Sequence, residues 1–333
     1  AAALGAGETS YNDSSATAGT PYYYWVRATN STSQSLSDFS ASAEGLRLLT
    51  EPTLAASNIT FSALATDAMT VNWERGDGDF VLVVARQGAA PDDPTDSTVY
   101  DADAAFGFGD ITGAGSFVVY KGTGTSVPVT GLSTATEYTF AVYEFNGAAL
   151  PNYRTSDEPV ETRSTLVAGP SVQATNITIS GIFEVSMTGI DWTDGDGTSR
   201  LLVVKAGGAV DSFPVDGTTY SYSTNFGSGS EIGTGNYVVW EGAGRPERIS
   251  SLERDVIYHF RVFEFNGSAG TENYLTNAAA GNPVSQTTKA GNPDSQPYDL
   301  AISSLDSNQV TLTWTRGTAG TNTLVAIRAT AAS

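Results

Sequence analysis

Residues 117–147 read FVVYKGTGTSVPVTGLSTATEYTFAVYEFNG, and residues 237–267 read YVVWEGAGRPERISSLERDVIYHFRVFEFNG. The two stretches match at a constant step, so that Tyr138, for example, lies 120 residues before Tyr258. A repeat of this length is a whole domain rather than a solenoid unit. The chain is therefore predicted to be a tandem array of like modules, and such arrays space, display or assemble other parts.

Composition excludes several classes of partner. The chain has 333 residues, which suggests two to three domains, and carries 36 acidic against 16 basic residues, a formal charge of −20. So negative a surface repels nucleic acid and anionic lipid. The absence of cysteine excludes disulfides and thiolate metal sites, and fits an extracellular bacterial protein at least as well as a cytosolic one. No apolar run approaches the roughly 18 residues of a membrane span, so we expect no membrane insertion.

Strand signals dominate the pattern. Met69, Val71 and Trp73 alternate with polar residues, which is typical of a half-buried strand. Turn residues recur at short intervals, as in Gly76-Asp77-Gly78 and Asn146-Gly147, and no convincing amphipathic helix is found. Many short strands separated by regular turns predict an all-β fold built of β-sandwiches.

The repeats align over most of their length. Trp73 corresponds to Trp192 and then to Trp314, and the run beginning at Val81 is matched with the run beginning at Leu201. Phe106-Gly-Phe-Gly corresponds to Phe226-Gly-Ser-Gly. Boundaries fall in proline-bearing linkers. The predicted modules are 1–50 (last strands only), 51–167 (complete), 168–289 (complete) and 290–333 (first strands only).

Each module resembles a fibronectin type III domain. The family pattern is a core tryptophan, then a leucine and, six residues later, a tyrosine that begins an alternating strand; Leu132 with Tyr138 and Leu252 with Tyr258 match it. The resemblance implies tandem immunoglobulin-like sandwiches. It also implies a tyrosine corner, in which the ring packs in the core while the hydroxyl bonds an upstream backbone group.

The modules depart from this family in size. A typical member of the family is shorter than this repeat of 120 residues. The extra length lies at roughly 86–116 and 206–236. We interpret each insertion as an added hairpin or long loop that carries the FGxG turn. This enlarged form resembles repeats in large secreted bacterial surface proteins, which implies an extracellular or cell-surface location.

Four aspartates are candidate calcium ligands: Asp77 and Asp79 in one module, and Asp194 and Asp196 in the next. Calcium takes clustered carboxylate and carbonyl oxygens, although the downstream glutamate of a calcium loop is missing. The alternative, a tight Gly-Asp turn, is favoured. No cofactor other than this optional calcium is expected.

Other chemistry is predicted to be absent. Arg75-Gly76-Asp77 spells an integrin-binding tripeptide, but a turn explains it better. A single histidine, His259, builds neither a triad nor a histidine metal site. Glu144 and Glu264 occupy equal positions, which favours a structural role over a catalytic one. We expect no catalytic residue, and the chain is predicted not to be an enzyme.

Two functions are weighed. The first is a structural or adhesive repeat region of an extracellular fibre, stalk or surface protein, whose partners are neighbouring copies or modules. The second is an accessory, carbohydrate-binding region of a large secreted enzyme, with Trp240 or Tyr120 stacking on surface glycans. Cross-strand packing is the favoured interpretation of those two aromatic residues.

The end segments suggest two explanations. Neither the last strands near residues 9–47 nor the first strands near 296–333 can bury an apolar face alone. Either the sequence is a window cut from a longer array, or one copy completes the next by strand exchange. We favour the window, because Leu324 begins an enlarged module whose inserted segment is missing, and the start AAALGAGETS looks like the middle of a longer polypeptide.

Overall fold

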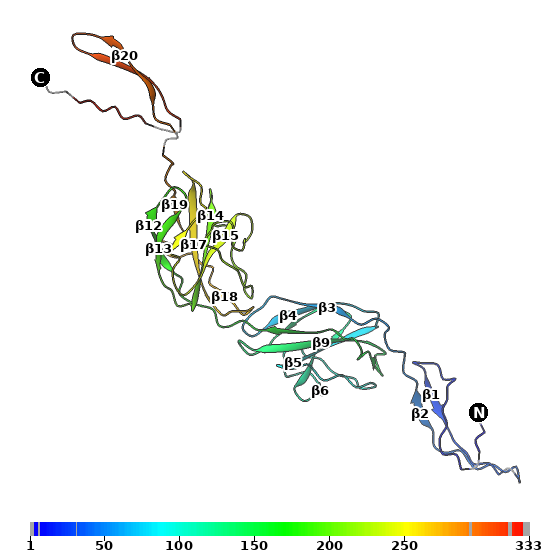
Figure 1. The fold of residues 1–333 in the computed structure, drawn as a ribbon. Helices are drawn as coiled ribbons and strands as arrows, with labels where there is room; N and C mark the ends of the chain where they lie inside the picture. Colours follow the sequence, from blue (N-terminus) through cyan, green and yellow to red (C-terminus); the bar gives the residue numbers. More distant parts are fainter. Residues whose placement is uncertain (1–2, 6, 31, 293–294, 319–321, 329–333) are drawn as a thin grey trace. The chain divides into compact units, whose positions relative to one another are not determined.

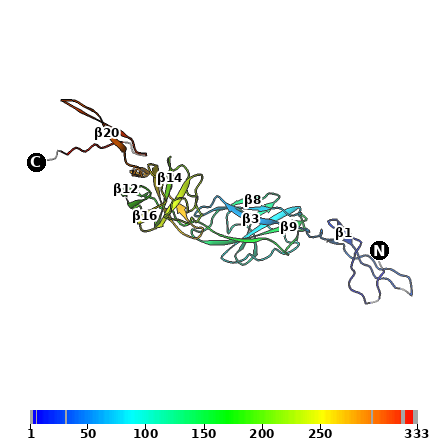
Figure 2. The same ribbon diagram turned by 45° about the horizontal axis from the view of Figure 1, so that its top comes forward.

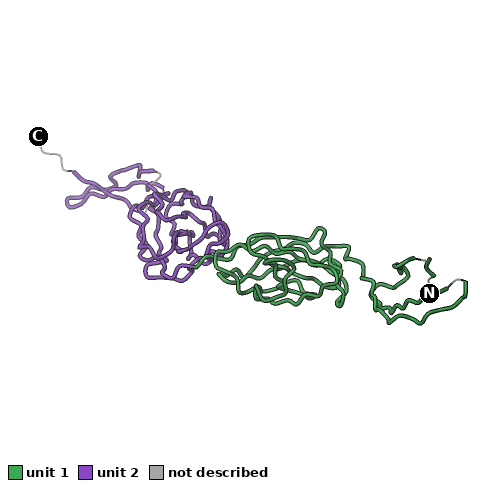
Figure 3. The backbone as a smooth tube through the Cα atoms, turned by 90° about the horizontal axis from the view of Figure 1, so that it is seen from below, with its two compact units in different colours: residues 1–168 green, residues 169–333 purple. Residues whose placement is uncertain are grey.

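The structure is a computed structural model that describes residues 3–5, 7–30, 32–292, 295–318 and 322–328. Over these residues the chain is all-β, with strands β1 to β21 and no helix. The described residues contain no helix that is long and apolar enough to cross a membrane. The chain divides into two compact units, residues 1–168 and 169–333 (Figure 3). The further division into four modules stays a prediction.

The first unit contains a complete sandwich, whose two layers can be followed in Figure 1 and Figure 2. One sheet has the order β3-β4-β8; the other runs β10-β9-β5-β7-β6, and β11 also pairs with β9. This is the arrangement that the fibronectin type III resemblance implies, and the predicted all-β sandwich fold is confirmed. The strands are β3 (Ser57–Ser62), β4 (Met69–Glu74), β5 (Phe80–Gln87), β6 (Ile111–Gly113), β7 (Ser116–Gly122), β8 (Ser126–Val129), β9 (Glu137–Asn146), β10 (Asn152–Tyr153) and β11 (Val160–Ser164).

The second unit repeats this topology. Its sheets have the orders β12-β13-β16 and β15-β14-β17-β18, and β19 also pairs with β17. A single bridge between Glu231 and Tyr237 stands where the first unit has β6. The strands are β12 (Thr175–Ile182), β13 (Met187–Thr193), β14 (Ser199–Ala206), β15 (Asn236–Gly242), β16 (Arg248–Ile249), β17 (Ile257–Asn266), β18 (Asn273–Tyr274) and β19 (Val284–Thr287).

The core between the sheets is built around one tryptophan and one tyrosine per module. Trp73 and Trp192 are 3% and 4% exposed, and each belongs to the same apolar cluster as its module's Tyr138 or Tyr258. This confirms the predicted core.

The tyrosine corner has the predicted geometry. The Tyr138 hydroxyl accepts a hydrogen bond from the Ser133 amide at 2.9 Å, and the Tyr258 hydroxyl accepts one from the Glu253 amide at 2.8 Å. Each bond joins residues five apart and closes the turn that starts the long strand.

The inserted segment of each module forms a cover over the outer face of the larger sheet. β5 reads FVLVVARQ, and Val81 to Ala85 are all fully buried, because one strand face meets the sandwich core and the other meets the insertion. Tyr100 from the insertion packs with Tyr143 and Tyr153 in this second core. Of the two predicted forms, a hairpin or a long loop, the described residues of the insertion are mainly a long loop, with one short strand, β6, that pairs antiparallel with β7.

The FGxG turn has a packing role. Phe106 meets the corner tyrosine Tyr138 edge-on, with ring centroids 5.0 Å apart, and Phe226 meets Tyr258 at 5.1 Å. Each insertion is thus anchored to the tyrosine corner at the sandwich core.

Two strand pairs lie outside the sandwiches. β1 (Pro21–Tyr24) pairs with β2 (Ala43–Leu46), and β20 (Tyr298–Leu305) pairs with β21 (Val310–Thr315). In the described part of the chain, neither pair joins another sheet.

Candidate functional site: the buried glutamate turn

Glu144 on β9 and Glu264 on β17 are 1% and 0% exposed. The β9 residues two and four positions before Glu144, Val142 and Phe140, lie in the core between the sheets. Because alternate residues of a strand share a face, Glu144 lies on that same side, at the end of the core. A buried carboxylate costs much free energy unless cations and hydrogen-bond donors surround it, so neighbouring residues must supply them.

In the first module the turn after Trp73 supplies these donors. Arg75 binds Glu144 through two parallel bonds, Nε to Oε1 at 2.8 Å and Nη2 to Oε2 at 2.9 Å. The Gly76 amide donates to Oε1 at 2.7 Å. Arg75 also donates to the carbonyl oxygens of Gly78 and Thr123. The guanidinium thus joins the turn to the end of the core.

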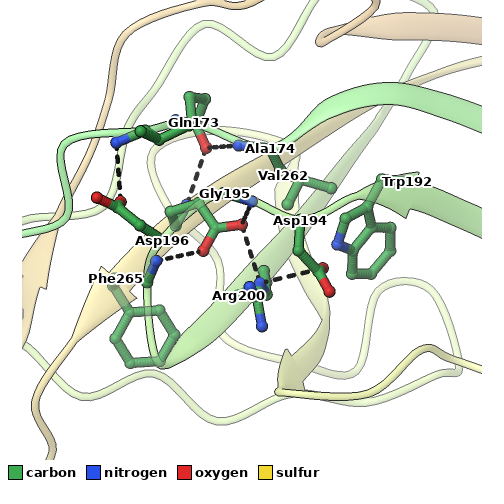
Figure 4. Close-up of polar contacts among 12 residues, drawn as sticks. Gln173, Ala174, Trp192, Asp194, Gly195, Asp196, Arg200, Val262 and Phe265 are labelled. Atoms are coloured by element: carbon green, nitrogen blue, oxygen red, sulfur yellow. Dashed lines mark hydrogen bonds and ion pairs between the residues drawn. The ribbon is translucent and has the colours of Figure 1, made fainter.

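In the second module the arginine comes from a strand. Arg200 on β14 donates from Nε to Glu264 Oε1 at 2.9 Å, and the amides of Gly195 and Gly197 donate to the same carboxylate at 2.8 and 3.0 Å. Asp194 lies 3.3 Å from Arg200 Nε, as the dashed line in Figure 4 shows. Arg245 pairs with the same Asp194 at 2.8 Å.

These partners correct the alignment made from sequence. β9 pairs Val81 with Glu144, whereas β17 pairs Arg200 with Glu264, so Val81 corresponds to Arg200 and not to Leu201. Arg75 likewise corresponds to Asp194. The cation therefore comes from the turn in the first module and from strand β14 in the second, whereas the buried carboxylate occupies the same position in both.

The four calcium candidates lie in or beside these turns. Asp77 accepts bonds from the Thr53 hydroxyl and the Leu54 amide, and Asp196 accepts bonds from the hydroxyl and amide of Ser171 and from the Val172 amide. The Thr53 and Ser171 hydroxyl bonds are the main reason that the pKa of each carboxyl lies below its ordinary value.

The other two candidates are placed differently. Asp194 is held by arginines, and the Asp79 amide donates to Asn146. Within the described ranges no group of three or more His, Asp or Glu side chains is suited to a metal ion. Calcium at these four residues stays a hypothesis.

The Arg75-Gly76-Asp77 tripeptide is tied down at both ends. Arg75 binds the buried Glu144, and Asp77 binds the chain entering the module through Thr53 and Leu54. The turn interpretation accounts for both side chains.

The other residues singled out from the sequence lie on strands β17, β7 and β15. His259 is partly exposed on β17. Tyr120 packs on Trp73 with centroids 5.3 Å apart, and Trp240 packs on Tyr222 at 5.2 Å. Both are contacts within one module, in line with the favoured packing interpretation.

Sequence reasoning missed Arg261, which is 8% exposed beneath the second insertion. Its guanidinium carbon lies 4.5 Å from the Phe213 ring centroid and 5.0 Å from that of Phe263, and Nη2 donates to the Thr276 carbonyl at 2.6 Å. Burial lowers its pKa. The available signal was a lone arginine among the apolar residues of IYHFRVFEFN.

The first module has a different polar contact at the corresponding place beneath its insertion. Tyr143 stands where the second module has Phe263, and its hydroxyl donates to Asp93 at 3.0 Å. Each module thus has its own polar contact beneath its cover.

Comparison with known proteins finds partial likenesses to solved structures and no family match. No family model and no curated protein matches the sequence. Among solved structures, the chain is similar to the FN1–FN3 domains of chicken CNTN1, at 12% identity and a TM-score of 0.37, covering 80% of this chain and 77% of that one. It is also similar to a two-domain fibronectin type III segment of chicken tenascin, at 17% identity and a TM-score of 0.24, covering 72% and 100%.

Proposed function

We propose that this chain is a structural or adhesive repeat region of an extracellular fibre, stalk or surface protein, of the kind found in large secreted bacterial proteins. The observation that carries the proposal is the buried glutamate turn. In both modules the buried glutamate is occupied in holding a turn against the core, and a different residue supplies the cation in each. A chain of such modules spaces or displays other parts and performs no catalysis.

Composition supports the same role. The charge of −20 and the absence of cysteine suit a surface that stays soluble in salt water without redox-sensitive thiols. The expected partners are neighbouring modules or copies of the same protein. Nucleic acid and membrane lipid are not expected partners.

Gold-labelled antibodies raised against the 333-residue chain test this proposal on thin sections of cells of the source organism. Regular surface filaments or a labelled surface layer are expected by electron microscopy. Label confined to the cell interior would overturn the proposal.

The alternative is a carbohydrate-binding accessory region, which the half-exposed Tyr222 beside Trp240 favours. Affinity electrophoresis in gels containing soluble polysaccharides separates the two functions. The structural role expects unchanged mobility, whereas retardation that Trp240→Ala abolishes would favour the alternative.

A further inference from the structure

The C-terminal strand pair has the features of the first two strands of a complete module. Leu300 and Trp314 lie 241 residues after Ile59 and Trp73. Asp299 has the same positive φ of 54° as Asn58. A Cβ on Gly317 would overlap the Ser295 carbonyl oxygen, as one on Gly76 would overlap that of Leu54. β20 and β21 therefore correspond to β3 and β4.

The N-terminal pair has the features of the last two strands. The Tyr22 hydroxyl accepts a bond from the Thr17 amide at 3.2 Å, which reproduces the tyrosine corner. Gly19, three residues before this tyrosine, has a φ of 74°, and Ala135, three before Tyr138, has a φ of 53°. β1 and β2 therefore correspond to β9 and β11.

Both pairs leave exposed the positions that a complete module buries. Ile59, Met69 and Trp73 are 8%, 1% and 3% exposed, whereas their counterparts Leu300, Val310 and Trp314 are 70%, 57% and 37% exposed. Val142 on β9 is fully buried, whereas its counterpart Val26 is 72% exposed. Each pair presents the apolar face that the other kind of strand covers in a complete module.

Residues 322–328 follow β21 as β5 follows β4. By the same offset, Leu324 corresponds to Val83, which β5 pairs with Val142. Leu324 is 93% exposed here. The complete modules thus define a register for the missing contact, with Leu324 opposite Val26.

We propose that a second copy of this sequence supplies the missing strand contacts, with residues 296–318 and 322–328 of one copy joining residues 9–30 and 32–47 of the next. The joined pieces hold the counterparts of β3, β4, β5, β9 and β11. This inference rests on the proposed structural role and names the contact through which repeats are joined. The contact is heterologous, because it uses two different surfaces of one chain, so it extends head to tail and need not close.

Two variants of the full chain test the contact by complementation. Val26→Asp and Leu312→Asp each put a carboxylate into one half of the shared core and leave the other half intact. Each should raise the concentration needed for assembly about a hundredfold or more. Phe108→Asp, at a residue 79% exposed on a complete module, is the matched control and should assemble like the wild type.

Mixing the two blocked variants in equal amounts should give a dimer of twice the 34.7 kDa chain mass by analytical ultracentrifugation, and no longer polymer. Near-ultraviolet circular dichroism of each variant checks that the complete modules are folded. A wild-type chain that stays monomeric at all concentrations, including by closing on itself, would overturn the inference, as would two variants that fail to complement.

Cysteine cross-linking tests the register, since the chain has no native thiol. A Val26→Cys chain mixed with a Leu324→Cys chain should form a disulfide-linked dimer. Replacing Leu324→Cys by Gln309→Cys, beyond the end of β20, should abolish it. Equal cross-linking of both mixtures would contradict the register. If these tests fail, the complete modules can still serve as spacers. Antibody label found only inside cells, by contrast, would contradict the proposed function itself.

Discussion

A single buried carboxylate fixes the turn after the core tryptophan in both modules. Glu144 and Glu264 bind the same backbone amide position, Gly76 and Gly195. The arginine that neutralises the carboxylate comes from different places in the chain. Removing one member of a buried ion pair is costly. The two modules show that the cation can come from either of two positions that reach this carboxylate.

Arg200→Val should therefore destabilise the second module by about 3 kcal/mol, because it leaves Glu264 buried without its cation. The triple variant D194R/R200V/R245T copies the residues of the first module, Arg75, Val81 and Thr125, and should recover most of the loss. Urea unfolding followed by circular dichroism measures both. A triple variant no more stable than Arg200→Val would contradict the proposed exchange.

The core tryptophan gives a second prediction at this scale. Trp192→Ala should lower the free energy of unfolding by about 3–5 kcal/mol, since it empties a large space in the core. The Arg245 guanidinium, 4.0 Å from the Trp192 ring centroid, would lose its contact as well. Chemical denaturation of the variant measures the cost; a loss under about 1 kcal/mol would show that the site repacks.

The lowered pKa of Asp196 predicts an acid dependence. A carboxyl with a lower pKa folded than unfolded stabilises the protein above its unfolded pKa, about 3.9. That stability is lost as the pH falls through the lower, folded pKa. Asp196→Asn should lower the melting temperature at pH 7 and flatten its decline below about pH 4. Asp79→Asn is the control, and an equal effect there would contradict the role given to the Ser171 bond.

At the scale of elements, the sandwich and its corner could be predicted because each has a local signal. The alternation around Trp73 and the spacing from Leu132 to Tyr138 depend on contacts that a strand makes with its own core. The cover could not be predicted as such, because its contacts lie far apart in sequence. The uninterrupted apolar run of β5 does indicate the cover. A strand with one solvent-exposed face alternates apolar and polar residues, whereas a strand buried on both faces is apolar throughout.

The alignment of β14 with β5 predicted from the sequence was wrong for a related reason. Matching Val81 with Leu201 follows hydrophobicity, whereas the structure places the charged Arg200 at the Val81 position. The buried Arg200 is stable at this position because it pairs with Glu264, which lies far away in the sequence. A comparison of hydrophobic patterns along the chain does not detect such a pair.

The cover predicts a contrast between neighbouring residues. Tyr100→Ala should destabilise the first module by about 3 kcal/mol, because Tyr100 is buried in the second core and packs on Tyr153 with centroids 6.0 Å apart. Val99→Ala, one residue earlier and 47% exposed, should change stability by less than about 0.5 kcal/mol. Thermal melting of both variants makes the comparison, and equal effects would mean that the insertion is a loose loop.

For the whole molecule, charge opposes assembly while apolar faces favour it. Each chain carries a formal charge of −20, so two copies repel each other as they approach. The exposed positions of the strand pairs, such as Leu300 and Val26, provide the attraction. The balance between them depends on the ionic strength.

Raising the ionic strength from about 0.01 to 0.15 M shortens the Debye length from roughly 30 to 8 Å, so repulsion between copies is screened. The concentration of the 333-residue chain needed for assembly should therefore fall with added salt, as light scattering can follow. Sodium, magnesium and calcium chlorides at equal ionic strength should act alike if screening is the whole effect. A much larger effect of calcium, reversed by a chelator and abolished by replacing Asp77 and Asp196 with Asn, would instead establish the calcium site.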